Sequence, residues 1–95
     1  MSVDIRLPAA LRAFADRQDT ISVEAKTLGG ALNALFLRHG RLKAQLLGPD
    51  GTLRPFVNVY VNEDDARDKQ GLGTPLRDGD TVLIAPAIAG GSRGA

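Results

Sequence analysis

Few side chains in this sequence are of the types that usually act in catalysis or bind metals, and those few do not make up a catalytic or metal-binding group. Cysteine is absent from the 95 residues, so the chain offers neither a thiolate nucleophile nor a disulfide. His39 is the only histidine, and it ends an apolar helical pattern. A histidine in that place more often packs or interacts with the helix dipole than catalyses. No second ligand or nucleophile accompanies it.

Two further patterns imitate known motifs but lack their spacing. The acidic group within residues 63–68 has neither the glycine nor the distal glutamate of an EF-hand loop. Gly71 and Gly73 imitate the start of a dinucleotide-binding motif, yet Leu76 stands where the third glycine belongs. A solvated hairpin and an ordinary loop are the better interpretations, and no metal site is predicted.

The remaining candidate is a pair of glycines, Gly90 and Gly91, near the end of the chain. Pro86 precedes the pair, and it cannot donate to a sheet ladder. Residues 88–95 are small and glycine-rich, so they can bury almost nothing, and we expect them to form a flexible tail. A glycine pair alone is a weak signal, so its meaning depends on the elements that precede it.

The composition is typical of one small globular domain, which we expect to cover residues 1–87. Hydrophobic residues make up 43% and charged residues 24%, enough apolar material to offset chain entropy. The net charge of +1 comes from interspersed signs, and aromatic residues are 4%, which argues against binding nucleic acid. No apolar run is long enough for a bilayer, and the charged N-terminus is unlike a signal peptide. We expect a cytoplasmic protein with no membrane partner.

The apolar pattern predicts the elements that must position the glycine pair. Alternation predicts strands over residues 2–7, 20–24, 56–62 and 81–85, the first two antiparallel. In the third of these the valines are expected to face the core. A helical pattern over residues 28–39, capped by Thr27 and ended by Gly40, predicts the main helix. Shorter helical turns are expected over 8–16 and 41–47, a hairpin tip at 63–65 and tight turns at 48–51 and 78–80.

The order strand, strand, long helix, then strands is that of a β-grasp domain, an α+β fold. At this point the chain resembles the ThiS/MoaD family of ubiquitin-like sulfur carriers over nearly its whole length. The matching segments are residues 56–62, 75–82 and 86–91. An Asp-Gly-Asp turn, an apolar strand, a proline and then Gly-Gly at this distance form a specific combination. The resemblance implies a mixed sheet of four to five strands packed on one main helix.

The resemblance also implies the chemistry of Gly91. In this family the terminal carboxylate attacks the α-phosphate of ATP inside an E1-like adenylyltransferase and sulfurtransferase, and a sulfur donor then converts the acyl-adenylate into a thiocarboxylate. The carrier itself is not an enzyme and binds no cofactor; ATP is used by the partner. Gly90 and Gly91 suit this role, because a Cβ would obstruct an extended tail in a narrow site and the approach to its carbonyl.

Residues 92–95 depart from the mature family pattern, since the carboxylate of Ala95 cannot replace that of Gly91. The resemblance implies cleavage before Ser92 by a JAMM-type metalloprotease. The alternative is a harmless extension on a chain that is never activated.

Partner binding is expected from Ile88, Ala89 and Gly90 of the tail and from Phe56 and Tyr60. Phe56 and Tyr60 alternate with the valines, so they form an exposed docking patch or are covered by residues 41–53. The ending over residues 84–91 looks most like carriers that serve cysteine synthesis with a PLP-dependent synthase. The small subunit of molybdopterin synthase and a ubiquitin-like modifier that forms isopeptide bonds remain alternatives.

Overall fold

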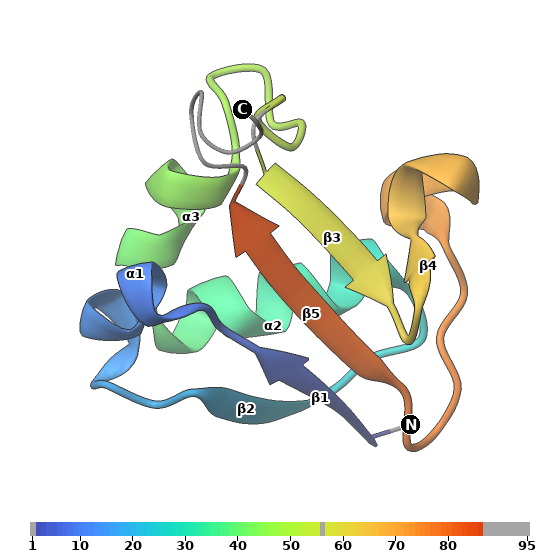
Figure 1. Cartoon of the computed structure of the whole chain (residues 1–95), viewed down its shortest axis with the longest axis horizontal. Helices are drawn as coiled ribbons and strands as arrows, with labels where there is room; N and C mark the ends of the chain where they lie inside the picture. Colours follow the sequence, from blue (N-terminus) through green and yellow to red (C-terminus); the bar gives the residue numbers. More distant parts are fainter. Residues whose placement is uncertain (1, 56, 87–95) are drawn as a thin grey trace.

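A five-stranded mixed sheet forms the centre of the molecule (Figure 1). The computed structural model describes residues 2–55 and 57–86. The strands are β1 (Ser2–Arg6), β2 (Thr20–Glu24), β3 (Val57–Val61), β4 (Asp64–Asp65) and β5 (Thr81–Pro86), in the spatial order β2-β1-β5-β3-β4. β1 and β5 run parallel at the centre, and the other neighbours are antiparallel. The predicted mixed sheet is confirmed.

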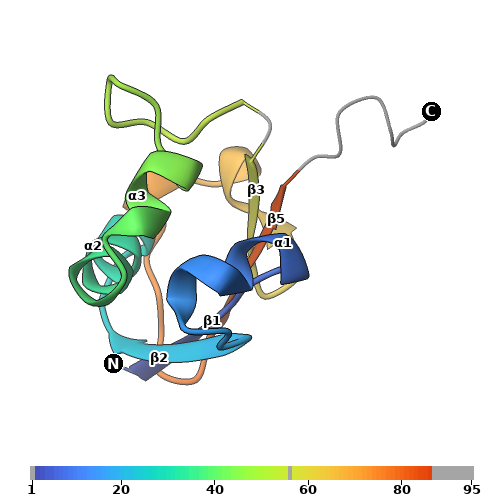
Figure 2. The same ribbon diagram turned by 90° about the vertical axis from the view of Figure 1, so that its left-hand side faces the viewer.

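The two longest α-helices lie on one side of this sheet (Figure 2). The main helix is α2 (Leu28–Arg38), and α1 (Ala9–Arg12) and α3 (Arg41–Leu46) are shorter. The described residues also contain three single turns of 3-10 helix: η1 (Ala13–Ala15), η2 (Ala66–Asp68) and η3 (Gly71–Gly73). Thr27 caps α2 as predicted, because its Oγ1 accepts a hydrogen bond from the Gly30 amide at 3.1 Å.

Alternating burial along the strands explains how the sheet holds the helix. The largest fully buried side chains come from β1, β3, β5 and α2, with Leu42 and Leu46 added from α3. The valines of β3 face this core as predicted, since Val57, Val59 and Val61 are each at most 4% exposed. A strand that buries every second residue sends the residues between them to the opposite face.

Two local predictions were wrong. Gly40 is not the C-cap of α2: the helix ends at Arg38 with His39 as its C-cap, and Gly40, with a φ of −57°, is the N-cap of α3. The next helix starts so soon that the glycine belongs to its beginning. The hairpin tip is at Asn62 and Glu63, one position earlier than expected, and Asp64 and Asp65 form β4. Asn62 accepts the positive φ of 59° that this tip requires.

Candidate functional site

The described part of the last strand ends at Pro86, five residues before Gly91. Within the described residues, Ala85 and Pro86 pair with β3 alone, opposite Asn58 and Val57. β1 pairs with β5 only as far as Leu83. Although β5 is the central strand, its last two described residues are therefore held from one side. The predicted tail residues Ile88, Ala89, Gly90 and Gly91, together with Phe56, lie outside the described residues.

The open face of the sheet lies beside this end of β5. Tyr60, Leu83 and Arg6 are directly opposite one another on β3, β5 and β1, so their side chains share one row on the face turned away from α2. Tyr60 is half-buried, Leu83 is 39% exposed, and Arg6 is exposed. An apolar pair flanked by a cation is a surface that a protein partner can bind.

The structure also bears on what covers Tyr60. Helix α3 packs its Leu42 and Leu46 into the same core as the valines, so α3 lies on the opposite side of the sheet from Tyr60. This placement favours the open-surface alternative for Tyr60. Leu83 was missed as a site residue, although its alternation with the buried Val82 and Ile84 could have indicated it.

Arg67 binds the start of β3 through its guanidinium group. Nη2 donates to the carbonyl oxygens of Val57, Arg54 and Pro55 at 2.6, 3.1 and 3.4 Å, and Nη1 donates to Asn58 Oδ1 at 2.9 Å. The Arg67 amide in turn donates to Asp65 Oδ1 at 2.8 Å. The sequence provided no signal for this residue, because its partners lie nine to thirteen positions away.

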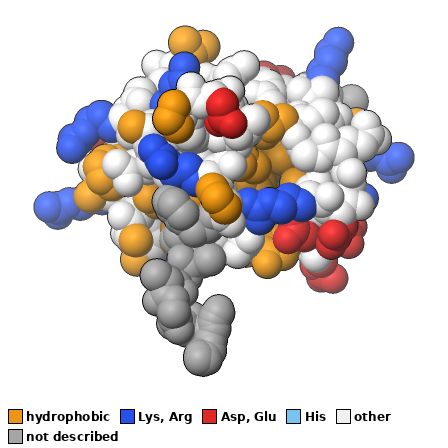
Figure 3. Space-filling view, turned by 90° about the horizontal axis from the view of Figure 1, so that it is seen from above, with side chains coloured by type: hydrophobic (Ala, Val, Ile, Leu, Met, Phe, Trp, Pro, Cys, Tyr) orange, Lys and Arg blue, Asp and Glu red, His pale blue; other side chains and the backbone are white. Residues whose placement is uncertain are grey.

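The surface above the start of β3 is formed by residues 48–55. All of them except Gly51, together with Arg67, line a pocket of about 610 Å³. Seen from this end of the molecule, apolar and basic side chains share the surface, and acidic side chains gather mainly at one edge (Figure 3). Two hydrogen bonds lower the pKa of Asp50 below its usual 3.8: the Thr52 amide and then the Thr52 hydroxyl donate to its carboxylate.

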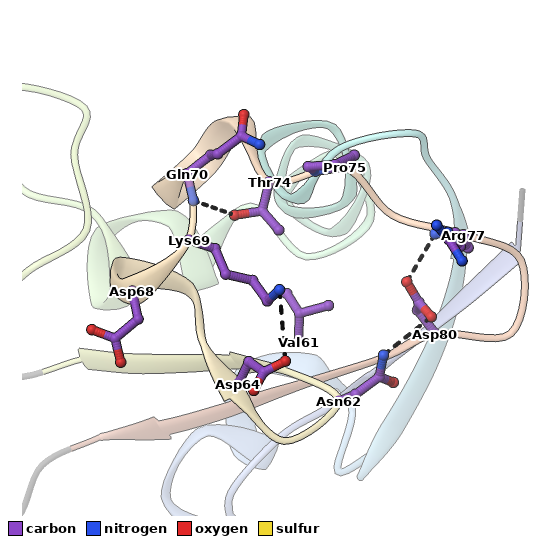
Figure 4. A pocket seen from close by; sticks show the side chains of 10 residues that line it. All are labelled: Val61, Asn62, Asp64, Asp68, Lys69, Gln70, Thr74, Pro75, Arg77 and Asp80. Atoms are coloured by element: carbon purple, nitrogen blue, oxygen red, sulfur yellow. Dashed lines mark hydrogen bonds and ion pairs between the residues drawn. The ribbon is translucent and has the colours of Figure 1, made fainter.

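A second pocket, of about 590 Å³, lies at the opposite end of β5 (Figure 4). Its polar groups are bound to one another: Lys69 pairs with Asp64 at 3.6 Å, and Asn62 Nδ2 donates to Asp80 Oδ1 at 3.2 Å. The buried Thr74 is satisfied as well, since its hydroxyl donates to the Gly71 carbonyl at 2.7 Å. These contacts hold together the loops that line the pocket.

The described residues contain neither a metal-binding cluster nor a membrane-spanning helix. No three His, Cys, Asp or Glu side chains among residues 2–55 and 57–86 are placed to hold a metal ion. In the same residues no helix is long and apolar enough to cross a membrane. The candidate site therefore consists of the open face of the sheet and the end of β5, the strand that leads to the tail.

Comparison with known proteins decides the family. The model of the ThiS family matches residues 5–91. The chain belongs to the ThiS family. It is 39% identical over 93 residues to the sulfur carrier protein CysO of Mycobacterium tuberculosis, a match that covers 96% of this chain and all of that protein. Sulfur carriers of this family are substrates of partner enzymes and not enzymes themselves, and they hold no cofactor of their own.

Solved structures agree with this assignment. The structure of the Amycolatopsis orientalis BexX/CysO complex contains a chain with 35% identity and a TM-score of 0.87, and the match covers 94% of this chain and 99% of that one. SAMP1, a small archaeal modifier protein of Haloferax volcanii, has 32% identity and a TM-score of 0.83, with 96% and 100% covered. The ubiquitin-like β-grasp fold predicted from the sequence is therefore confirmed.

Proposed function

We propose that this protein is a sulfur carrier for cysteine synthesis whose reacting group is the main-chain carboxylate of Gly91. The observation that carries the proposal is the extent of the family match, which ends at Gly91, the second residue of the glycine pair, with residues 92–95 beyond it. The identity to CysO over 96% of the chain supports the cysteine branch.

The first step is removal of residues 92–95 by a JAMM-type metalloprotease. Hydrolysis of the bond between Gly91 and Ser92 adds one water and leaves a free carboxylate on Gly91. Without this step the terminal carboxylate belongs to Ala95, whose methyl group would stand beside the reacting carbon. The glycine carboxylate is open on both sides, which suits a reaction inside another protein's narrow site.

Activation and sulfur transfer then follow in an E1-like partner. The Gly91 carboxylate oxygen attacks the α-phosphorus of ATP, and pyrophosphate leaves. A sulfide or persulfide sulfur attacks the acyl carbon, and AMP leaves with the electron pair of the broken carbon–oxygen bond. A persulfide first gives an acyl disulfide, and a thiol then attacks the donor's sulfur, forms a disulfide with the donor and releases the thiocarboxylate. The product is a thiocarboxylate that a PLP-dependent synthase takes as its sulfur source.

The chain's described residues contribute binding and presentation to this sequence. Tyr60 and Leu83 supply apolar contact area beside the end of β5, and Arg6 supplies a charge in the same row. We infer that the activating partner docks on this row, because it lies on the strand that carries the tail. The tail residues Ile88, Ala89 and Gly90 then run from the docked surface into the partner's site.

Two other functions would use the same activation of Gly91. SAMP1, a small archaeal modifier protein, has 32% identity, so an isopeptide bond from Gly91 to a lysine is the second candidate. Similarity to a putative molybdopterin converting factor subunit from Pyrococcus furiosus, at 22% identity, concerns the fold alone. The acceptor of the thiocarboxylate distinguishes a cysteine carrier from a molybdopterin synthase subunit.

The intact mass of the protein, isolated from its own cells without reductant, tests the proposal. We expect a chain that ends at Gly91, with one oxygen replaced by sulfur in part of the population. A branched peptide that joins Gly91 to a lysine would instead establish the modifier function. If every molecule ends unmodified at Ala95 even under sulfur starvation, the proposal is wrong and residues 88–95 are inert.

A further inference from the structure

The guanidinium group of Arg67 occupies a position where a longer β4 would run. β4 pairs only with Tyr60 and Val61, so among the described residues no strand covers the first half of β3 on that side. There the Val57 carbonyl accepts a hydrogen bond from Arg67 Nη2 at 2.6 Å. An uncovered strand edge is otherwise free to bend, fray or pair with another chain. Arg67 therefore holds the start of β3 in place of a strand.

The start of β3 in turn holds the end of β5. Val57 is opposite Pro86 and Asn58 is opposite Ala85, whereas β1 stops pairing with β5 at Leu83. Within the described residues, a chain of contacts thus runs from the Arg67 guanidinium through β3 to Pro86. If the start of β3 becomes more mobile, Pro86 becomes more mobile as well, and the segment that bears Gly91 follows Pro86.

We propose that Arg67 is a positioning residue for the tail, an inference that rests on the proposed function. By holding Val57 and Asn58, Arg67 gives Pro86 a defined place and direction beside the open face. A partner that docks on Tyr60 and Leu83 then meets a tail with a fixed origin, and less conformational freedom is lost on binding. In this role Arg67 acts through β3 and not by contact with the reacting carboxylate or with ATP.

The contacts require the shape of the guanidinium and not only its charge. Its planar fork reaches three main-chain carbonyls and the Asn58 amide oxygen together. The single ammonium group of a lysine cannot span these acceptors. Arg67→Lys therefore keeps the charge and loses most of the bridge, whereas Arg67→Ala loses both.

Kinetics with the E1-like adenylyltransferase of the same organism test the proposal. The chain ending at Gly91 is compared with its Arg67→Ala and Arg67→Lys variants. Arg77→Ala is the matched control, since Arg77 is an exposed arginine at the opposite end of β5. We expect Arg67→Ala to raise KM for the carrier about tenfold with kcat nearly unchanged, Arg67→Lys to raise it severalfold, and the control to match the parent.

Equal KM values for the two arginine-to-alanine variants would overturn the proposal. If Arg67→Ala does not fold, Arg67→Lys decides in the same way against the Arg77 control. A second readout separates this inference from the proposed function. In the full chain we expect Arg67→Ala to speed amide hydrogen exchange at Val57 and Ala85 about tenfold, with Ile5 and Val82 unchanged.

If the parent chain is not adenylated, the proposed function fails, and the exchange rates still test the positioning role. Unchanged exchange at Ala85 in Arg67→Ala would then show that Arg67 does not hold the end of β5. Faster exchange throughout the chain, at Ile5 as much as at Ala85, would show a general stabilising role and would likewise overturn the proposal.

Discussion

The two ends of β5 are held in different ways. At its start, Thr81 pairs with Asp4 of β1, and its amide and carbonyl bond to Asn62 on the other side at 3.1 and 2.7 Å. The preceding turn is tied to the N-terminal strand, because the Gly79 amide donates to the Ser2 carbonyl at 2.8 Å. At its end, Ala85 and Pro86 have β3 alone as a described strand neighbour.

Because of this difference, one end of β5 contributes mainly to the stability of the fold and the other end to the presentation of the tail to a partner. The start of β5 is enclosed by two strands and a turn, so a change there should alter folding. The end is held from one side, with Arg67 behind it, so a change there should alter how the tail meets a partner. The predictions below test this division, beginning with the largest expected effect.

Replacement of a core residue of β5 should destabilise the fold far more than replacement of its neighbour on the open face. Ile84 is fully buried, and Ile84→Ala should lower the free energy of unfolding by about 3 kcal/mol. Leu83→Ala, at a side chain 39% exposed, should cost less than about 1 kcal/mol and instead raise KM for the activating enzyme. Urea titration and adenylation kinetics measure both. Similar losses of stability in the two variants would refute the assignment of faces.

Gly91→Ala should leave the stability unchanged and slow thiocarboxylate formation on the order of a hundredfold, because the added methyl group displaces the reacting carboxylate. Gly94→Ala is the matched control, since residue 94 is removed before activation in the proposed sequence of steps. Mass spectrometry of the full chains after incubation with the metalloprotease, ATP, the activating enzyme and a sulfur donor measures both the cleavage and the product. Equal yields from both variants would contradict the role of Gly91.

Gly79→Ala should reduce stability by about 1 kcal/mol without altering sulfur loading. Gly79 has a φ of +87° in the turn before β5, a conformation that costs an alanine about this much. Gly73→Ala is the control, because Gly73 has an ordinary φ and its added Cβ would meet Gln70 Cβ at a relaxed 4.0 Å. Thermal unfolding distinguishes them, and a loss of loading in Gly79→Ala at full stability would undo the division between the two ends.

The smallest expected effect is a pH dependence in residues 48–55. Hydrogen bonds from Thr52 lower the pKa of Asp50, so the carboxylate stabilises this loop above pH 3.8. That contribution is lost as the pH falls through the lowered pKa. The NMR shift of the Thr52 amide should therefore titrate with a midpoint below 3.8, and Asp50→Asn should abolish the titration. A midpoint above 3.8 in the parent chain would contradict the hydrogen bonds.

Local patterns were sufficient to predict most elements, and the failures have a common cause. The valine alternation over residues 57–61 and the helical spacing over 28–38 each depend on one buried face, so period alone reveals them. Gly40 was misassigned as the C-cap of α2 because a glycine between two helical segments can end one or precede the other, and the packing of both helices decides which. The hairpin tip moved to Asn62 because pairing with β5 decides where β3 ends.

For the candidate site, the proposed chemistry at Gly91 comes from the family resemblance that the sequence motifs carry, whereas the surface beside the tail is defined by the tertiary structure. Gly90 and Gly91 are informative as sequence, because the absence of a side chain is itself their contribution. The row of Tyr60, Leu83 and Arg6 depends on the register of three strands, which the order of residues does not encode locally. Arg67 is the clearest case: its acceptors are main-chain carbonyls, and any residue type supplies one, so only the folded chain reveals which of them it holds.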